Sequence, residues 1–139
     1  MPKDAVPRLL IVEDDRDLNE LIARVAREHG CEVRSAYTGE DALALLRTEQ
    51  IDWLLADIRL PGRIDGWNVG SEFSLSHPLR PIIYISGTER DSSRKVAGSI
   101  FLFKPVELSD LVAMFERLGI RANKARGLGD GKTPAQLPA

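Results

Sequence analysis

Acidic residues follow two apolar runs of the chain at the point where each run stops. The run Trp53–Ala56 ends in Asp57, and the run Arg8–Val12 is followed directly by Glu13 and Asp14. Carboxylates held close together cannot all ionise without a compensating cation. Oxygen ligands of this kind suit Mg²⁺ or Mn²⁺, so the pattern predicts a divalent-cation site if the fold brings the two runs together.

Two further apolar runs end in residues that bind anions. Pro81–Ile85 is followed by the hydroxyl of Ser86, and Ile100–Phe103 is followed by the ammonium group of Lys104. A lysine and a hydroxyl opposite a metal ion suit an anionic ligand, for which phosphate is the obvious candidate. Taken alone, Asp57 is just as well explained as a strand-ending aspartate that caps a turn.

The hydrophobic pattern predicts the elements that position these residues. Apolar runs and alternation predict five strands: Arg8–Val12, Glu32–Ala36, Trp53–Asp57, Pro81–Ile85 and Ile100–Phe103. Apolar residues at helical spacing predict helices from Asp17 up to Gly30 and over Gly39–Glu49, Trp67–Leu75 and Glu107–Leu118. The short polar segment Glu89–Val96 has room for only about two helical turns and is expected to be the remaining helix. This alternation predicts an α/β fold in which five helices flank a doubly wound, five-stranded parallel sheet of order 2-1-3-4-5.

Composition and charge narrow the class of protein. The chain has 139 residues, 43% of them hydrophobic and 29% charged, which is typical of one globular domain. We expect this domain over residues 8–119, after an N-terminal extension of residues 1–7 and before a basic, disordered tail of residues 120–139. The net charge of −2 argues against direct nucleic-acid binding. Without a signal region or membrane-spanning run, we expect a cytoplasmic protein with no membrane insertion.

Several polar residues have structural interpretations. Asp15 is expected to cap the first helix, and Gly30 to end it in a left-handed conformation. His29 and His77 are expected to be solvated residues in loops or at helix ends. Cys31, the single cysteine, excludes an intramolecular disulfide and is expected to be a small buried hydrophobe.

The strand-end motifs, in this order, resemble those of the response-regulator receiver domain, the CheY-like phosphoacceptor module of two-component signalling. The resemblance covers roughly residues 8–118. The matching pieces are Ile11-Val12-Glu13-Asp14-Asp15, Asp57-Ile58-Arg59-Leu60-Pro61-Gly62 with Asp65-Gly66-Trp67, Ile85-Ser86-Gly87, and Phe103-Lys104-Pro105-Val106.

The resemblance implies a role for each strand-end residue. Asp57 would accept a phosphoryl group from a phosphohistidine on a partner protein. Asp14 would bind Mg²⁺ directly and Glu13 through water, with Asp57 and the backbone carbonyl of Arg59 as further ligands. The phosphoryl group would then contact the side chains of Ser86 and Lys104, the Lys104–Pro105 bond would be cis, and Ser86 and Phe101 would form the switch pair.

Two departures from the family pattern concern loops. Arg63-Ile64 stands where the common pattern has one residue, so the loop after Asp57 is one residue longer. Lys104 follows Ser86 by 18 positions. That spacing is about one helical turn short of the usual one and predicts a shortened fourth helix.

The leading hypothesis is a stand-alone receiver, because the tail is too short to form an output domain. Its partners would be a sensor histidine kinase or a histidine phosphotransfer protein and an unknown downstream protein, and it would be a monomer or weak homodimer. It would not be an enzyme beyond self-catalysed phosphorylation and dephosphorylation. The alternatives are a receiver-like adaptor that works without phosphorylation and an aspartate-nucleophile phosphatase, whose usual second acid is replaced by Arg59.

Overall fold

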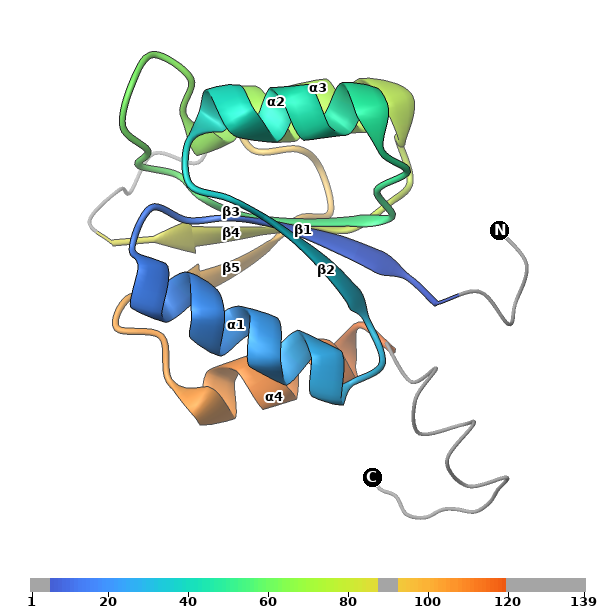
Figure 1. The fold of residues 1–139 in the computed structure, drawn as a ribbon, viewed down its shortest axis with the longest axis vertical. Helices are drawn as coiled ribbons and strands as arrows, with labels where there is room; N and C mark the ends of the chain where they lie inside the picture. Colours follow the sequence, from blue (N-terminus) through green and yellow to red (C-terminus); the bar gives the residue numbers. More distant parts are fainter. Residues whose placement is uncertain (1–5, 88–92, 120–139) are drawn as a thin grey trace.

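The computed structural model describes residues 6–87 and 93–119, which form a three-layer α/β domain (Figure 1). Five parallel strands lie in the order β2-β1-β3-β4-β5, which confirms the predicted topology. In chain order the elements are β1 (Arg8–Val12), α1 (Arg16–Glu28), β2 (Glu32–Ala36), α2 (Gly39–Thr48), β3 (Trp53–Asp57), α3 (Gly66–Ser76), β4 (Ile82–Ser86), β5 (Ile100–Phe103) and α4 (Leu108–Arg117).

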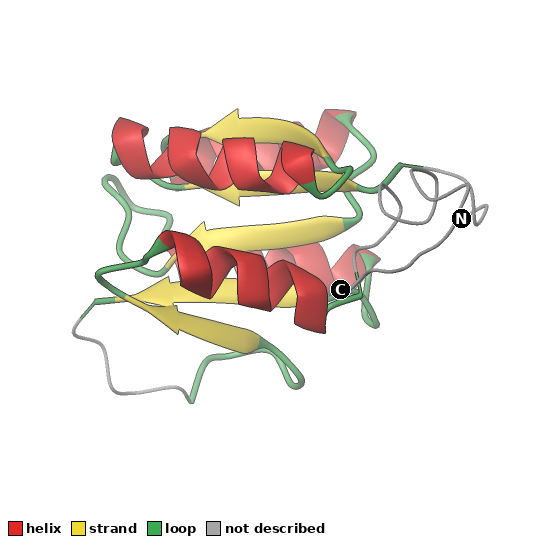
Figure 2. Ribbon diagram, turned by 90° about the horizontal axis from the view of Figure 1, so that it is seen from below, coloured by secondary structure: helices red, strands yellow, loops and turns green. Residues whose placement is uncertain are grey.

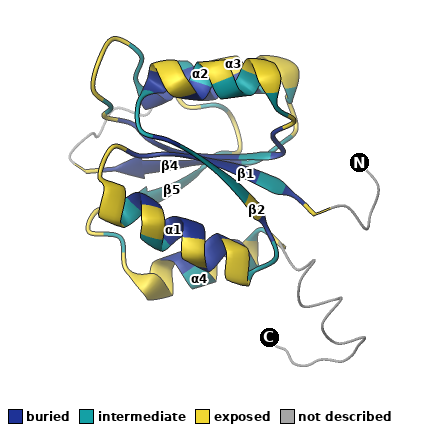
Figure 3. Ribbon diagram, viewed as in Figure 1, coloured by how far each residue is buried: buried dark blue, intermediate teal, exposed yellow. Residues whose placement is uncertain are grey.

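The central strands are apolar because helices cover both faces of the sheet. All five residues of β4 are buried, and so are four of the five in β3, whereas the edge strands β2 and β5 are mostly half-exposed (Figure 3). Strands covered on both faces need apolar side chains in both directions. The continuous runs of β3 and β4 therefore reflect their central position, whereas the apolar run of β5 lies at the edge of the sheet.

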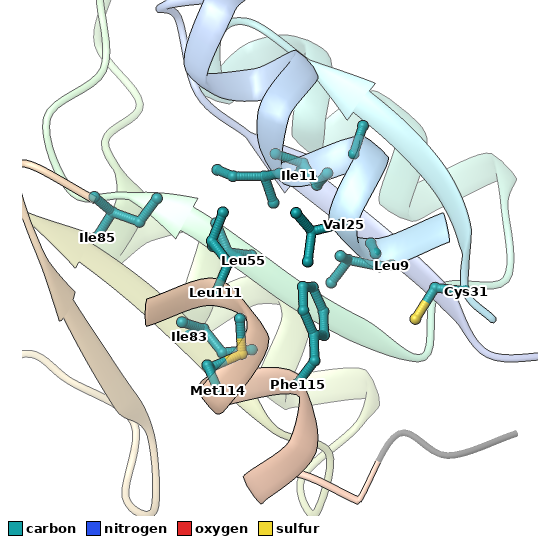
Figure 4. Close-up of a cluster of buried hydrophobic side chains, with 13 residues drawn as sticks. Leu9, Ile11, Val25, Cys31, Leu55, Ile83, Ile85, Leu111, Met114 and Phe115 are labelled. Atoms are coloured by element: carbon teal, nitrogen blue, oxygen red, sulfur yellow. The ribbon is translucent and has the colours of Figure 1, made fainter. Parts of the chain in front are cut away.

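Successive residues of each strand belong to opposite cores. Leu9, Ile11 and Leu55 pack with Val25 of α1 and Phe115 of α4 on one face (Figure 4). On the other face, under α2 and α3, lies a second cluster that contains Leu10, Val12, Leu54, Ile82, Tyr84 and Phe73. This period of two is what a pleated strand imposes, and it fixes which side of the sheet each residue supports.

Capping residues fix where the helices that follow the strands begin and end. The carboxylate of Asp15 accepts hydrogen bonds from the backbone N–H groups of Asp17 and Leu18, which confirms it as the N-cap of α1. Gly30, with a φ of 90°, follows the end of that helix, as predicted. Asp65 caps α3 and exchanges capping hydrogen bonds with Asn68.

The prediction of a helix over Glu89–Val96 is wrong for the part that the structure describes. Residues 93–99 form turns, so the described chain has four helices, and the label α4 belongs to the helix predicted over Glu107–Leu118. Residues 88–92 lie outside the described part. So short a helix is unstable without a packed apolar face, and Val96 is the one residue of 93–99 that packs against a core cluster. Its N–H donates to the Tyr84 hydroxyl at 3.4 Å.

No helix in residues 6–87 and 93–119 is long and apolar enough to cross a membrane. The predicted extension of residues 1–7 and tail of residues 120–139 fall almost wholly outside the described residues. Those boundaries therefore stay predictions.

Candidate functional site at the carboxyl ends of the strands

All five strands run in the same direction, so their carboxyl ends meet at one edge of the sheet (Figure 2). Asp57 ends β3 and Ser86 ends β4, while Glu13 and Lys104 come directly after β1 and β5. The structure therefore brings the predicted strand-end residues to one place. In open α/β sheets, this edge is where ligands bind.

Asp57 is held from two sides at the centre of this edge. The residue as a whole is 2% exposed. Oδ2 lies 2.7 Å from Nζ of Lys104 in a salt bridge, and Oδ1 accepts the backbone N–H of Arg59 at 2.9 Å. A carboxylate at this depth needs such partners, because burying an unpaired polar or charged group costs free energy.

Glu13 lies beside Asp57 and is fully buried, at 0% exposed. Oε2 accepts the backbone N–H of Asp15 at 3.0 Å. Oε1 lies 3.6 Å from Nζ of Lys104, which is within ion-pair range, yet it has no hydrogen-bond partner in the described structure. Burial, with the nearby negative charge of Asp57, raises the pKa of Glu13 to about 8 despite the opposing effects of the Asp15 N–H and Lys104.

The acidic cluster fits a hard divalent cation. Glu13, Asp14 and Asp57 each offer one oxygen, and these oxygens lie within 4.8 Å of one another. Asp14 is exposed, so the cluster opens to solvent on its side. Oε1 of Glu13 makes no hydrogen bond, and the raised pKa of that carboxyl shows that Lys104 alone does not stabilise its ionised form; a bound cation would.

Lys104 connects this cluster to β4. Its backbone N–H donates to the carbonyl of Ser86 at 2.9 Å, and its peptide bond to Pro105 is cis, the isomer that the resemblance implies. Burial by itself lowers the pKa of Lys104. The hydrogen bond and charge of Asp57, helped by the charges of Glu13 and Asp14, outweigh this effect and raise it.

The neighbourhood of Gly87 leaves room for an incoming group. Among the described residues, a Cβ placed on Gly87 would approach only Cδ of Lys104, at 4.0 Å. Ser86, the residue before it, is buried at the end of β4.

The loop between β3 and α3 contacts α2, which the sequence did not predict. The backbone N–H of Arg63 donates to Oε2 of Glu40 at 3.2 Å. Gly62, with a φ of 89°, lies close to the same carboxylate, since a Cβ placed there would be 2.9 Å from Oε2 of Glu40. An acid in the first turn of a helix is ordinarily explained by the helix dipole, so no local signal marks Glu40 as a loop contact.

Phe101, the predicted switch aromatic, is half-buried in an aromatic group on the α3 side of β5. Its ring centroid lies 5.5 Å from that of Tyr84, 6.2 Å from that of Trp67 and 6.3 Å from that of Phe103. Tyr84 and Trp67 come from β4 and α3. These aromatic side chains fill space on the sheet face beside residues 93–99, where the described chain has no helix.

The predictions for residues outside the site are mostly confirmed. Cys31 is buried, and its burial raises the pKa of the thiol to about 12. His29 and His77 end helices as expected, and both are half-buried rather than fully exposed. The ring of His29 stacks on Phe115 and that of His77 on Phe73, and each of these phenylalanines belongs to a core cluster.

The geometry defines a doubly wound α/β domain with an acidic, lysine-containing site at its strand ends. Over residues 9–116 the chain matches the family described as the response regulator receiver domain. The chain belongs to that family, which confirms the resemblance carried by the strand-end motifs.

Curated relatives are longer proteins of the same family. The chain is 33% identical over 129 residues to "Response regulator MprA" of Mycolicibacterium vanbaalenii, covering 88% of this chain and 54% of that protein. It is 33% identical over 117 residues to the protein of the same name in Mycobacterium avium, covering 80% of this chain and 50% of that one. The chain thus spans about half the length of the curated relatives that it matches.

Solved structures agree in fold. A response regulator receiver protein from Sinorhizobium medicae superposes with a TM-score of 0.75 and 27% identity, covering 87% of this chain and 97% of that one. The chemotaxis response regulator CheY4 of Vibrio cholerae superposes with a TM-score of 0.70 at 21% identity, covering 82% and 99%. The second likeness supports the fold alone.

Proposed function

We propose that this receiver domain accepts a phosphoryl group on Asp57 in a reaction that depends on Mg²⁺, and that it signals by changing its affinity for another protein. One observation carries the proposal: the buried carboxylate of Asp57 pairs with the ammonium group of Lys104 and clusters with two further acids, Glu13 and Asp14. This arrangement supplies a nucleophile, a cationic side chain and a metal-binding cluster in one place.

Glu13, Asp14 and Asp57, with the backbone carbonyl of Arg59, would hold the Mg²⁺ ion. The ion, when bound, supplies positive charge that neutralises the incoming phosphoryl oxygens. The residues fit this role because the cluster offers oxygens only, and one of them, Oε1 of Glu13, is buried without a hydrogen-bond partner.

In the proposed transfer, an oxygen of Asp57 forms a bond to phosphorus while the bond from phosphorus to the histidine nitrogen of the donor breaks. The imidazole leaves with its electron pair, and Asp57 becomes an acyl phosphate. Such reactions require mainly positioning and charge neutralisation. Lys104 lies 2.7 Å from Asp57 and would contact a phosphoryl oxygen, and the buried hydroxyl of Ser86 would bind another.

The donor would be a sensor histidine kinase or a histidine phosphotransfer protein, because these proteins carry phosphohistidine. The receiver would then have no separate substrate and would act as a phosphoacceptor rather than as an enzyme. Stand-alone action, a cytoplasmic location and the nature of the downstream protein stay predictions. The switch role of Ser86 and Phe101 belongs with them.

The proposal is tested by intact-mass spectrometry after incubation with acetyl phosphate and Mg²⁺. We expect one phosphoryl adduct on the wild type, lost in EDTA. Asp57→Asn should give no adduct. Asp15→Asn is the matched control, because it makes the same substitution at a nearby aspartate and should leave labelling intact. Circular dichroism verifies that each variant folds.

Two results would contradict the proposal. Equal labelling of Asp57→Asn and wild type would place the phosphoryl group elsewhere. No adduct, together with no binding of beryllofluoride in the presence of Mg²⁺, would favour an adaptor that works without phosphorylation. Turnover of small phosphomonoesters that depends on Asp57 would instead favour the phosphatase alternative.

A further inference from the structure

The two edges of the sheet differ in how they are protected against pairing with another strand. On β2, charged side chains border the edge: Arg34 pairs with Glu49 and Glu32 pairs with Arg8. β5 is the other edge, and its four residues, Ile100–Phe103, include no charge. Charged residues on an edge strand discourage pairing, and an apolar edge invites it.

The apolar edge of β5 is accessible. Three of its residues are half-buried, and Phe103 is 60% exposed although it is one of the largest apolar side chains of the domain. Residues Lys95 and Val96, which precede this strand, make contacts on the face of the sheet rather than along the β5 edge. The N–H of Val96 donates to the Tyr84 hydroxyl, and Nζ of Lys95 lies 5.8 Å from the centre of the Phe101 ring.

The backbone of β5 has a defined set of outward groups. Lys104 donates its N–H to Ser86, so its backbone groups face β4. Neighbouring residues in a strand face opposite ways, which turns Leu102 toward β4 as well and directs the N–H and C=O of Phe101 and Phe103 away from the sheet. Within residues 6–87 and 93–119, no hydrogen bond uses these outward groups.

We propose that two copies of this chain associate by pairing their β5 edges antiparallel, with the two-fold axis at Leu102, so that one sheet continues through both molecules. This register follows from the outward groups. It places Phe101 of each copy opposite Phe103 of the other, and each such pair exchanges two N–H···O=C bonds. Leu102 then lies opposite Leu102 of the other copy across the axis.

The side chains suit the same register. Residues directly opposite each other in an antiparallel pair lie on the same face of the sheet, so the Phe101–Phe103 stack within one copy continues onto the rings of the other. A shift of one residue would place the outward backbone groups of one copy opposite residues of the other copy whose backbone groups point toward β4, so no hydrogen bonds could form. The backbone and the aromatic side chains therefore select one arrangement.

The pairing does not require the proposed phosphorylation, because its hydrogen bonds use backbone groups of β5 and no group of the acidic cluster, although Phe101 also belongs to the proposed switch pair. It is short, and a four-residue strand pair buries far less than a standard interface. We therefore expect a weak dimer, half-formed at roughly 10–500 µM protein.

Sedimentation equilibrium of the full chain over this concentration range tests the proposal. The variant Phe103→Pro removes one outward N–H and leaves the bonds of β5 to β4 in place, because Leu102 and Lys104 make those bonds. We expect it to weaken the dimer at least about tenfold, or about 1.4 kcal/mol. Leu79→Lys is the matched control: Leu79 is 95% exposed, lies after α3, and should leave dimerisation unchanged.

Amide hydrogen exchange of the wild type provides a second readout that needs no variant. Exchange at the N–H groups of Phe101 and Phe103 should slow as the dimer fraction rises, while exchange at Leu102 stays constant. This measurement decides the question by itself if Phe103→Pro does not fold by circular dichroism.

Three outcomes would overturn the proposal. The first is a wild type that stays monomeric over the whole range, which would leave the β5 edge to a strand of another protein. The second is a dimer that Phe103→Pro forms as tightly as the wild type. The third is a dimer in which the Phe101 and Phe103 amides exchange as they do in the monomer, which would place the contact on another face.

Discussion

Glu13→Gln is expected to make the metal-free domain more stable at alkaline pH, although it removes a residue of the proposed metal site. In the folded protein the pKa of Glu13 is raised from 4.5 to about 8, with burial as the main cause. In the unfolded chain the carboxyl ionises near its ordinary value. The folded state therefore holds a proton that the unfolded state has already released.

The sign and the size follow from this difference. Below pH 4.5 both states are protonated and Glu13 costs nothing. Between pH 4.5 and about 8 the unfolded state binds fewer protons, so the free energy of unfolding falls as the pH rises. This difference in the pKa of Glu13 lowers the free energy of unfolding by at most about 5 kcal/mol. Movement of Lys104 toward the ionised carboxylate would offset part of that loss. We expect Glu13→Gln to be more stable by roughly 2 kcal/mol or more above pH 8.

Urea unfolding in EDTA at several pH values between 4 and 9 measures this difference. Glutamine keeps an oxygen that can accept the Asp15 N–H and offers an amide N–H to Asp57, so the substitution should not cost the fold a hydrogen bond. Asp14→Asn is the matched control, because Asp14 is exposed in the same cluster. With saturating Mg²⁺ the wild type should gain stability and Glu13→Gln should gain much less.

The reasoning is refuted if wild type and Glu13→Gln show the same dependence of stability on pH in EDTA. It is also refuted if the variant is the less stable protein at pH 9. Either result would mean that Glu13 is ionised in the folded domain without cost, and that the unpartnered Oε1 is compensated by something other than a metal ion.

Two further predictions concern packing around the site. Gly70→Ala should lower the free energy of unfolding by about 1–3 kcal/mol, because a Cβ there would overlap the hydroxyl of the fully buried Tyr84. Chemical denaturation checks this, and adding Tyr84→Phe should recover part of the loss; no recovery would show that the hydroxyl is not the obstacle. Glu40→Ala should weaken Mg²⁺ binding about two- to fivefold, since it frees the Arg63 N–H and with it the loop that carries Arg59. Isothermal titration measures the affinity, with Asp41→Ala as the neighbouring control, and equal effects of the two variants would contradict a specific role for Glu40.

The sequence predicted the parts of the fold that depend on local patterns. Continuous apolar runs correctly marked β3 and β4 as strands covered on both faces, but the equally apolar run of β5 lies at the edge of the sheet, so the run alone does not place a strand. Asp15 and Gly30 were correctly expected at the two ends of α1, because caps depend on residues next to them in the chain.

The short helix was predicted wrongly because its pattern was judged by length alone. Residues 93–99 form turns, and the aromatic side chains of Trp67, Tyr84 and Phe101 pack on the neighbouring sheet face. Those residues come from three distant elements, so no window of sequence reports that they meet. The contact of Glu40 with the β3–α3 loop was missed for the same reason.

The sequence by itself determined which residues stand at the strand ends, because the period of the apolar residues and the breakers after them are properties of neighbouring positions. Only the tertiary structure decided how those residues behave. Glu13 and Asp14 are adjacent in the chain, yet one is fully buried with a pKa of about 8 and the other is exposed. Burial and charge depend on everything that surrounds a side chain in space, and that is settled when the sheet and its two helical layers close around the site.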